Sequence, residues 1–293
     1  MPEKLLPVYQ IQDFNAPFPK REGFYLKTFE AHLREHAFIQ KPHKHDFFIL
    51  IFVTKGSGTH TVDFQTYPVA SNTVFFLIPG QVHAWQLAAD TEGFVIFFST
   101  EFYLLGHPQK KLFQFPFFNV LLHKPLLLLS EKERAEALAI LDLIWKEYEG
   151  REWKQEDVLR DLLDILLIKL ARIYQAKNAS AANAASGTLT QLQQLESLID
   201  RHYREHKPVL FYADSLAQTA KHLNDLCKQT LGKTTTELIQ DRTILEAQRL
   251  LIHSDLTITQ IAAKLGYFDN SYFSRFFKKK TGKTPEQFRQ EMA

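Results

Sequence analysis

Residues 261–278 read IAAKLGYFDNSYFSRFFK and predict two short helices joined by a tight turn. Ile261 and Leu265 recur at the spacing of one helix face. Gly266 follows, where the end of a helix favours a residue that tolerates positive φ. Asp269 then stands as an N-cap, because its carboxylate can accept from the free backbone N–H groups of the next turn. The stretch is a predicted helix-turn-helix.

The second predicted helix has an apolar side and a polar side. Its apolar side carries Tyr272, Phe273, Phe276 and Phe277. Its polar front carries Asn270, Ser271, Ser274, Arg275 and Lys278. An ordinary surface helix would also show two such sides, but this front suits the major groove, where arginine pairs with guanine and asparagine with adenine. We expect Arg275 to read a base and Lys278 to contact phosphate.

An internal repeat strengthens this interpretation. Residues 212–217 align with 261–266, and residues 221–234 align with 271–284, each copy ending in Gly-Lys-Thr. Between the copies, residues 235–254 predict one long helix. Two such units could address successive major-groove faces about 34 Å apart. Candidate DNA contacts in the first unit are Lys221, Asn224, Asp225 and Lys228.

Residues 189–293 resemble the DNA-binding domain of the AraC/XylS family of transcription regulators. The match is carried by Ile261-Ala262, Gly266-Tyr267, Ser271 to Lys278, Gly282 and Thr284 to Arg289. The resemblance implies double-stranded DNA as a partner, with RNA polymerase as a further candidate.

Charge and cysteine content fit such a protein. The net charge of the 293 residues is +2, and it divides into −1 for residues 1–188 and +3 for residues 189–293. The excess is carried notably by Lys278, Lys279, Lys280 and Lys283, which could contact phosphate or end a solvated helix. Cys227 is the single cysteine, so an intrachain disulfide is excluded. No uninterrupted apolar run approaches the ~18 residues of a membrane span, and we expect a cytoplasmic protein without membrane contact.

The pattern from about residue 23 to 99 is β. Short runs rich in Phe, Ile, Val and Thr are broken by Gly, Pro and Asn, which predicts a small barrel or jelly roll. Phe47 to Val53 is apolar at every position, as in a strand buried on both faces. The preceding residues 1–20 read as an irregular arm. Residues 100–125 predict loop and short helix.

Three histidines stand in two clusters of this region. His43-Lys44-His45 precedes the long strand, and Pro79-Gly80-Gln81-Val82-His83 follows later, over a segment (36–100) that resembles the cupin barrel. In metal-binding cupins such histidines share one ion with a glutamate, but Ile49 and Leu50 stand where that glutamate is expected. Three imidazoles could still hold Zn, Fe or Ni.

The favoured hypothesis assigns these histidines to a small-molecule effector. His43, His45 and His83 would hydrogen-bond the effector or one another, and Trp85 would supply an aromatic wall. The histidines could instead be merely polar groups at the barrel mouth. No cofactor is predicted.

Two helices follow the barrel. Ser130 and Glu133 form a predicted capping box for a helix that stops at Gly150, and residues 155–177 carry a broad leucine stripe. This stripe could cover the barrel and a second subunit together, so we expect a homodimer. Residues 179–187 are rich in Ala and Ser and read as a linker.

The fold prediction is an α+β multidomain chain. It divides into a cupin-like effector-sensing domain with its arm (1–128), a helical dimerisation region (129–178), a linker (179–188) and an all-α DNA-binding domain with two helix-turn-helix units (189–293). The favoured function is a DNA-binding transcription regulator, with activation and repression both left open, and not an enzyme. Two alternatives are a metal-dependent cupin enzyme with an appended helical domain, and a ligand-independent regulator that uses the barrel as a dimerisation scaffold.

Overall fold

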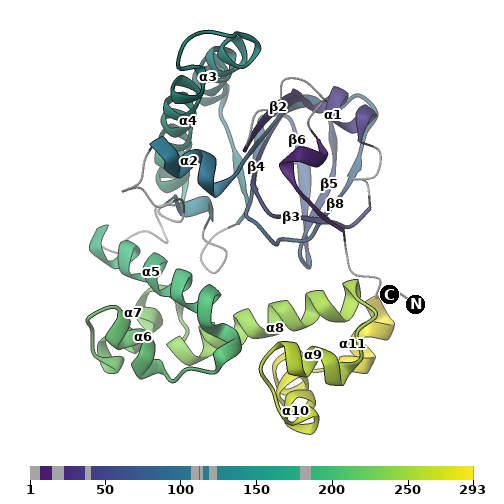
Figure 1. Ribbon diagram of the computed structural model, residues 1–293, viewed down its shortest axis with the longest axis vertical. Coiled ribbons are helices and arrows are strands. Elements are labelled where there is room, and N and C mark those ends of the chain that lie inside the picture. The colour runs from purple at the N-terminus through teal and green to yellow at the C-terminus, as the bar shows by residue number, and fades with distance from the viewer. Residues whose placement is uncertain are drawn as a thin grey trace. The chain divides into compact units, whose positions relative to one another are not determined.

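The computed structural model describes residues 7–14, 23–36, 41–106, 112, 115–118, 124–178 and 186–292. Its contacts divide the chain after residue 180, so that residues 7–180 form one unit and residues 181–293 lie in another. The first unit is β-rich with two long helices, and the second is helical (Figure 1). In the described ranges no helix is both long enough and apolar enough to cross a membrane.

Two antiparallel sheets build the first unit. One has the strand order β10-β7-β4-β9-β2, and the other has the order β6-β5-β8. The strands are β2 (Phe24–Thr28), β4 (Phe48–Lys55), β5 (Ser57–Val62), β6 (Gln65–Ala70), β7 (Thr73–Leu77), β8 (His83–Leu87), β9 (Glu92–Phe98) and β10 (Leu126–Leu128). This two-sheet arrangement is the predicted cupin-like barrel.

The central strand β4 explains why its sequence is apolar throughout. Phe48, Leu50 and Phe52 lie in one buried cluster, and Ile49 and Ile51 lie in another. Successive side chains of a strand point to opposite faces, so β4 serves both clusters at once. The second cluster fills the space between the two sheets, where the pocket described below is found.

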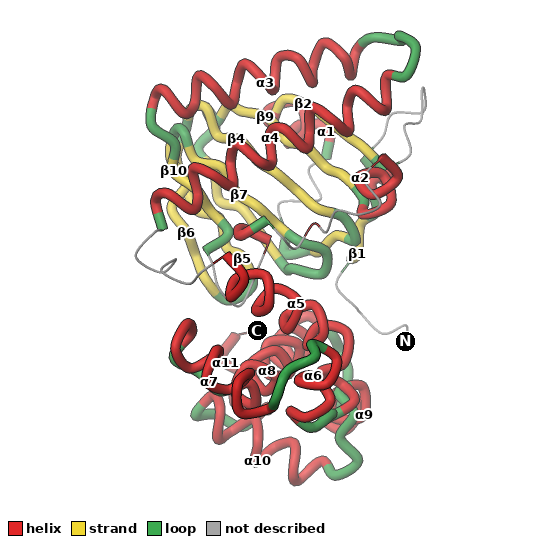
Figure 2. Tube along the Cα trace, turned by 90° about the vertical axis from the view of Figure 1, so that its left-hand side faces the viewer, coloured by secondary structure: helices red, strands yellow, loops and turns green. Residues whose placement is uncertain are grey.

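Helices cover the outer face of the larger sheet (Figure 2). They are α2 (Thr100–Gly106), α3 (Glu131–Glu149) and α4 (Gln155–Lys177), together with the short η4 (Pro116–Phe118). The predicted capping box of α3 is present, because Ser130 accepts from the Glu133 N–H and Glu133 accepts from the Ser130 N–H. Five of the six α4 leucines are wholly buried within the chain, and Leu162 is half-buried; the five are Leu159, Leu163, Leu166, Leu167 and Leu170.

The N-terminal part of the chain differs from its prediction. Within the predicted irregular arm, β1 (Val8–Tyr9) pairs in parallel with β3 (Lys44–His45), and η1 (Ile11–Asp13) follows. Residues 1–6 and 15–20 of the arm lie outside the described residues. Helix α1 (Phe29–Glu35) interrupts the region predicted as β, with Thr28 as its N-cap.

The helical unit contains the predicted repeat. Its elements are α5 (Ser186–His202), η5 (Tyr203–Glu205), α6 (Val209–Ser215), α7 (Ala220–Leu231), α8 (Thr235–His253), α9 (Ile258–Lys264), α10 (Asn270–Thr281) and α11 (Pro285–Met292). Helix α5 begins at Ser186, inside the segment predicted as linker, and linker residues 179–185 lie outside the described residues. Helix pairs α6–α7 and α9–α10 are the two helix-turn-helix units, joined by α8.

Candidate functional site

A small pocket lies between the two sheets of the first unit. Its lining is mainly apolar: Phe29, Ile49, Ile51, Trp85, Val95 and Phe97. Four histidines complete the wall: His32, His43, His45 and His83. All three histidines singled out in the sequence therefore meet in one place, with Trp85 beside them, as the effector hypothesis requires.

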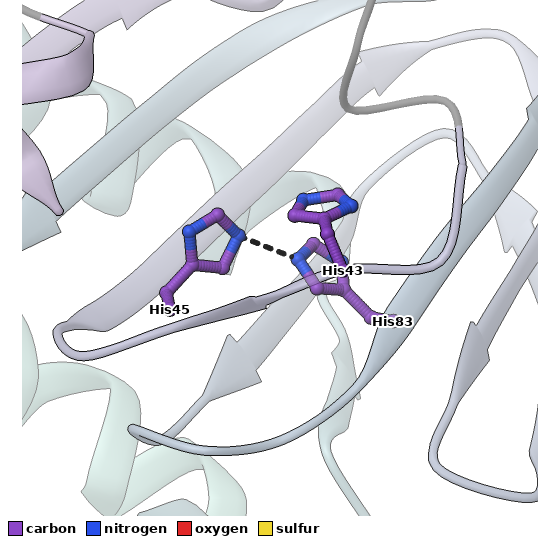
Figure 3. Close-up of side chains that lie close together, drawn as sticks. All are labelled: His43, His45 and His83. Atoms are coloured by element: carbon purple, nitrogen blue, oxygen red, sulfur yellow. Dashed lines mark hydrogen bonds between the residues drawn. The ribbon is translucent and has the colours of Figure 1, made fainter. Parts of the chain in front are cut away.

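Three of these imidazoles converge (Figure 3). One ring nitrogen from each of His43, His45 and His83 lies within 4.8 Å of the others. His45 Nε2 and His83 Nε2 are 2.8 Å apart. The strands bring them together, because His43 and His83 form a β-bridge and His45 lies two residues beyond His43 in β3. Two residues apart in an extended chain means one shared face.

We call His43, His45 and His83 the triad. Two of its rings, those of His43 and His83, are also anchored through the nitrogen that faces away from the other rings. His43 Nδ1 lies 2.7 Å from the Lys41 carbonyl oxygen, which fixes the proton on Nδ1. His83 Nδ1 lies 3.1 Å from His60 Nε2. His60 is itself wholly buried and stacks on Trp85, with ring centroids 3.4 Å apart.

Burial sets the charge of the cluster. Desolvation lowers the pKa of His43 to about 4 and the pKa of His32 to about 3. It also holds the pKa of His45, His60 and His83 well below the ordinary histidine value. The imidazoles are neutral at pH 7, and a neutral imidazole is the form that accepts a hydrogen bond or ligates a metal.

The size of the pocket limits what it can take without rearrangement. The room left between its side chains is about 10 Å³, which is close to that of one water molecule. The donor set fits a metal ion, since three neutral imidazoles are a known ligand set for zinc with a fourth position open. The position of the missing carboxylate is occupied by Ile49, which lines the pocket, while Leu50 packs on the opposite face of β4.

The N-terminal segment packs against histidine rings that line the pocket. Tyr9 stands opposite His45 in the β1–β3 register, and its ring centroid lies 5.5 Å from that of His43. Phe14 is buried against the rings of His32 and His45 at 5.4 and 5.8 Å. The segment 7–14 therefore packs directly on the histidines.

The second helix-turn-helix has the local geometry that its sequence predicts. Gly266 has φ +81°, and the Asp269 carboxylate accepts from the N–H groups of Ser271 and Tyr272. Phe273 and Phe277 form the buried back of α10. Tyr272 corrects the prediction of a buried side chain, because it is 57% exposed and contacts the ring of Tyr267 at the flank of the helix.

The predicted DNA contacts of α10 lie on an open surface. Asn270, Ser271, Arg275 and Lys278 are exposed, and Ser274 is half-buried. Neither Arg275 nor Lys278 has an ion-pair partner among the residues that the structure describes. Lys280 instead binds Asp241 at 3.1 Å, and Lys283 pairs with Glu291, so these two charges are engaged within the unit.

The first helix-turn-helix repeats the arrangement of the second, with one difference. Helix α7 buries Leu223, Leu226 and Cys227 and exposes Lys221, Asp225 and Lys228. Asn224 is half-buried, and its Oδ1 accepts from the Thr235 N–H at the start of α8. This bond holds the Asn224 side chain against the start of α8.

Comparison with known proteins gives matches over both units. A model of the AraC-like ligand binding domain matches residues 23–192, which is more than half of the chain. The chain belongs to the AraC family. A helix-turn-helix domain model matches residues 212–291. This AraC-family chain therefore has an N-terminal AraC-like ligand-binding domain and a C-terminal helix-turn-helix domain, as its sequence predicts.

Individual relatives align over shorter segments. The transcriptional activator RhaR of Cronobacter sakazakii is 42% identical over 69 residues, which are 24% of each chain. The bifunctional transcriptional activator/DNA repair enzyme AdaA of Bacillus subtilis is 35% identical over 92 residues, 31% of this chain and 44% of that protein. The chain thus spans less than half the length of these curated relatives.

Solved structures include ToxT of Vibrio cholerae with a bound unsaturated fatty acid. It is 16% identical, covers 92% of this chain and 96% of its own, and has a TM-score of 0.40. The C-terminal domain of AraT from Geobacillus stearothermophilus is 28% identical over 34% of this chain and 84% of its own, with a TM-score of 0.33.

Sequence reasoning about this AraC-family chain missed His60, His32 and Phe14. His60 could have been found from the alternation in β5, where His60 and Val62 are buried. His32 lies in a helix that the β pattern concealed, and Phe14 lies in an arm without regular periodicity.

Proposed function

We propose that this AraC-family chain is a one-component transcription regulator, acting in the cytoplasm, that reads DNA with α7 and α10 and binds an effector in its histidine-lined pocket. The observation that carries the proposal is the repeated unit. In both copies the apolar back of the second helix is buried and its polar front is exposed. The intervening α8 has 19 residues and so spans about 28 Å at 1.5 Å per residue, which suits two neighbouring major-groove faces.

Base reading by α10 rests on the side chains nearest its N-terminus. Asn270, Ser271, Ser274 and Arg275 would face base edges, and Lys278 a phosphate. Arg275 is exposed and without a partner in the described chain, so its guanidinium is available for bidentate pairing with guanine.

We assign the first helix-turn-helix a smaller part in reading the DNA sequence. Lys221 and Lys228 would contact phosphates, and Asp225 could accept from cytosine N4. Asn224 has already committed its carbonyl to α8, which leaves it the donor half of the adenine pairing. We infer that this unit positions the protein more than it discriminates.

The effector would be held by His43, His45 and His83, with Trp85 as the aromatic wall. Their burial in one pocket supports this assignment. The match of residues 23–192 to an AraC-like ligand binding domain favours this assignment over the two alternatives, an enzyme or a passive scaffold.

A homodimer remains part of the proposal, on a different surface from the one expected. The α4 leucine stripe packs against the barrel and is not free for a partner. Leu143, Val158 and Ile165 are instead exposed on the outer sides of α3 and α4. Sedimentation of the wild type and of Leu143→Glu/Ile165→Glu tests this surface. A monomeric wild type would refute it. RNA polymerase is kept as a further candidate partner.

Replacing Arg275 by alanine is expected to relax sequence preference. Loss of one bidentate contact costs about 1–3 kcal/mol of discrimination at one base pair. Binding should be measured by fluorescence anisotropy on a selected duplex and on duplexes changed at single positions. An unchanged preference in Arg275→Ala would refute its assignment as a base reader.

Lys278→Ala is the matched comparison. It should weaken binding to all duplexes alike and lower the slope of log K against log salt by about 1. Lys280→Ala should leave that slope unchanged, because Lys280 is held by Asp241.

Two exposed aromatic rings add a contact to the front of the second unit. Phe268 is fully exposed in the turn, and Tyr272 is 57% exposed one turn into α10. Apolar side chains in the major groove contact the thymine methyl group. Replacing thymine by uracil in the selected site should therefore weaken the wild type more than Phe268→Ser. Equal losses in both proteins would exclude this contact.

A further inference from the structure

We propose that the effector is a divalent transition-metal ion, held by Nε2 of His43, His45 and His83, with His60 as the residue that positions His83. The site itself stands on the pocket geometry alone. Only its effect on DNA binding rests on the proposed function.

The first argument is the direction of the donors. The Nδ1 of His43 faces a carbonyl and the Nδ1 of His83 faces His60, so both rings present Nε2 to the centre. His45 does the same, with Nε2 2.8 Å from His83 Nε2. Metal-binding histidines ordinarily use one nitrogen for the ion and anchor the other on a carbonyl or a polar side chain. Two of the three rings here are already anchored in that way.

The second argument is the size and chemistry of the pocket. Its room of about 10 Å³ admits one ion or water, whereas an organic metabolite would have to displace buried side chains. Among the described residues its lining contains imidazole and apolar groups, without a carboxylate. All-nitrogen donor sets favour Zn²⁺, Ni²⁺, Cu²⁺ or Fe²⁺ over Mg²⁺ or Ca²⁺. Three protein ligands also leave a coordination position open to water or an anion.

The third argument is the role of His60. It is wholly buried, contributes no atom to the triad, and touches His83 through Nε2 at 3.1 Å while stacking on Trp85. Such a partner fixes the ring orientation of a ligand. Because the expected glutamate is absent, His60 is the polar side chain that supports the triad from the second layer.

Binding at this site would have a structural consequence for the N-terminal segment. His45 lies in β3, whose only strand partner among the described residues is β1, and Tyr9 is paired with His45. Fixing His43 and His45 on an ion would therefore fix β3 and the segment 7–14 that packs on it. This is the route by which occupancy could alter the regulator.

The test uses the full chain, freed of metal by a chelator and dialysed. Zn²⁺ and Co²⁺ are titrated separately, with calorimetry for stoichiometry, the visible spectrum of Co²⁺ for coordination, and Tm as a further readout. We expect one ion per chain, a rise in Tm, and no response to Mg²⁺. His43→Gln and His83→Gln should abolish binding, and His60→Gln should weaken it about 10–100-fold at unchanged stoichiometry.

His36→Gln is the matched control. It removes a half-buried imidazole of the same unit that does not line the pocket, so the ion affinity of the variant should stay within about threefold of the wild type. Near-ultraviolet circular dichroism of each metal-free variant shows whether it is folded. No binding by the folded wild type, or full binding by folded His83→Gln, would overturn the site.

The DNA readout separates this inference from the proposed function. Affinity for the selected duplex should change at least tenfold between metal-free and Zn²⁺-loaded wild type, and not in His83→Gln. One bound ion with unchanged DNA affinity would overturn the effector role and leave the regulator intact. One bound ion in a chain that binds no DNA would overturn the proposed function and leave the metal site standing.

Discussion

Replacing Gly266 by alanine is expected to destabilise the helical unit by about 3 kcal/mol or more and to abolish specific DNA binding. The residue has φ +81°, and a Cβ there would lie 2.0 Å from the Arg204 carbonyl oxygen. The backbone of η5 cannot move away easily, because His206 Nε2 also bonds the Leu265 carbonyl at 3.0 Å. Thermal unfolding of the full chain, followed through the transition of its helical unit, measures the loss of stability. Fluorescence anisotropy with a DNA duplex measures the loss of binding.

The position of the first helix-turn-helix that aligns with Gly266 is Ala217, and it supplies the control. Ala217 has φ +53° and is exposed, so it occupies the same turn with a side chain that the backbone disfavours. Ala217→Gly should stabilise the unit by about 0.5–1 kcal/mol, since left-handed backbone costs a non-glycine residue roughly that much. A Gly266→Ala protein as stable as the wild type would contradict the close approach seen between η5 and the turn.

Acidification should destabilise the metal-free barrel unit strongly. His32 and His43 have folded pKa values lowered by burial to about 3 and about 4, whereas the unfolded chain binds protons near pH 6.5. Below pH 6.5 the unfolded state therefore holds more protons, and the free energy of unfolding falls by about 1.4 kcal/mol per pH unit for each such histidine. The loss continues until the folded values are reached.

Urea unfolding of residues 7–180 within the full chain, in chelator at pH 7.5, 6.0 and 5.0 and constant ionic strength, measures this slope. His32→Gln should reduce it by about 1.4 kcal/mol per pH unit, because one buried neutral imidazole is gone. Equal stability at pH 7.5 and 5.0 would mean that the folded chain binds protons as readily as the unfolded chain, so that burial does not lower the pKa of these histidines.

Much of the helical unit could be predicted from sequence because its determinants are local. Gly266, Asp269 and the Gly-Lys-Thr ends act within one or two turns, and the structure has the expected αL glycines and N-caps. The helix bounds of α4 and the capping box of α3 were predicted for the same reason. The burial of β4 on both faces could also be predicted, since a strand without polar positions has no face suited to solvent.

What sequence could not supply depends on tertiary contacts. Helix α1 lies among strands, and its buried Phe29 and His32 are held by the barrel, not by a clear helical period. Tyr272 has an aromatic side chain typical of a core, yet it is exposed because Phe273 and Phe277 already fill the back of α10.

The pocket was predicted in its residues but not in its size. His43, His45, His83 and Trp85 could be named from their spacing, because alternation in strands puts every second residue on one face. The anchoring of His83 by His60 joins β8 to β5, and such a cross-strand contact needs the register. The small room beside the rings, which favours an ion over a metabolite, follows only from the packing of both sheets.

The central claim is that two helix-turn-helix units read DNA together. Selection of binding sites from random duplexes with the full chain, followed by footprinting, tests it most directly. The account predicts one enriched site with two protected major-groove segments about 10 base pairs apart, and loss of preference in the segment read by α10 when Arg275 is alanine. A pool without enrichment, or protection of a single segment that Arg275→Ala leaves unchanged, would contradict it.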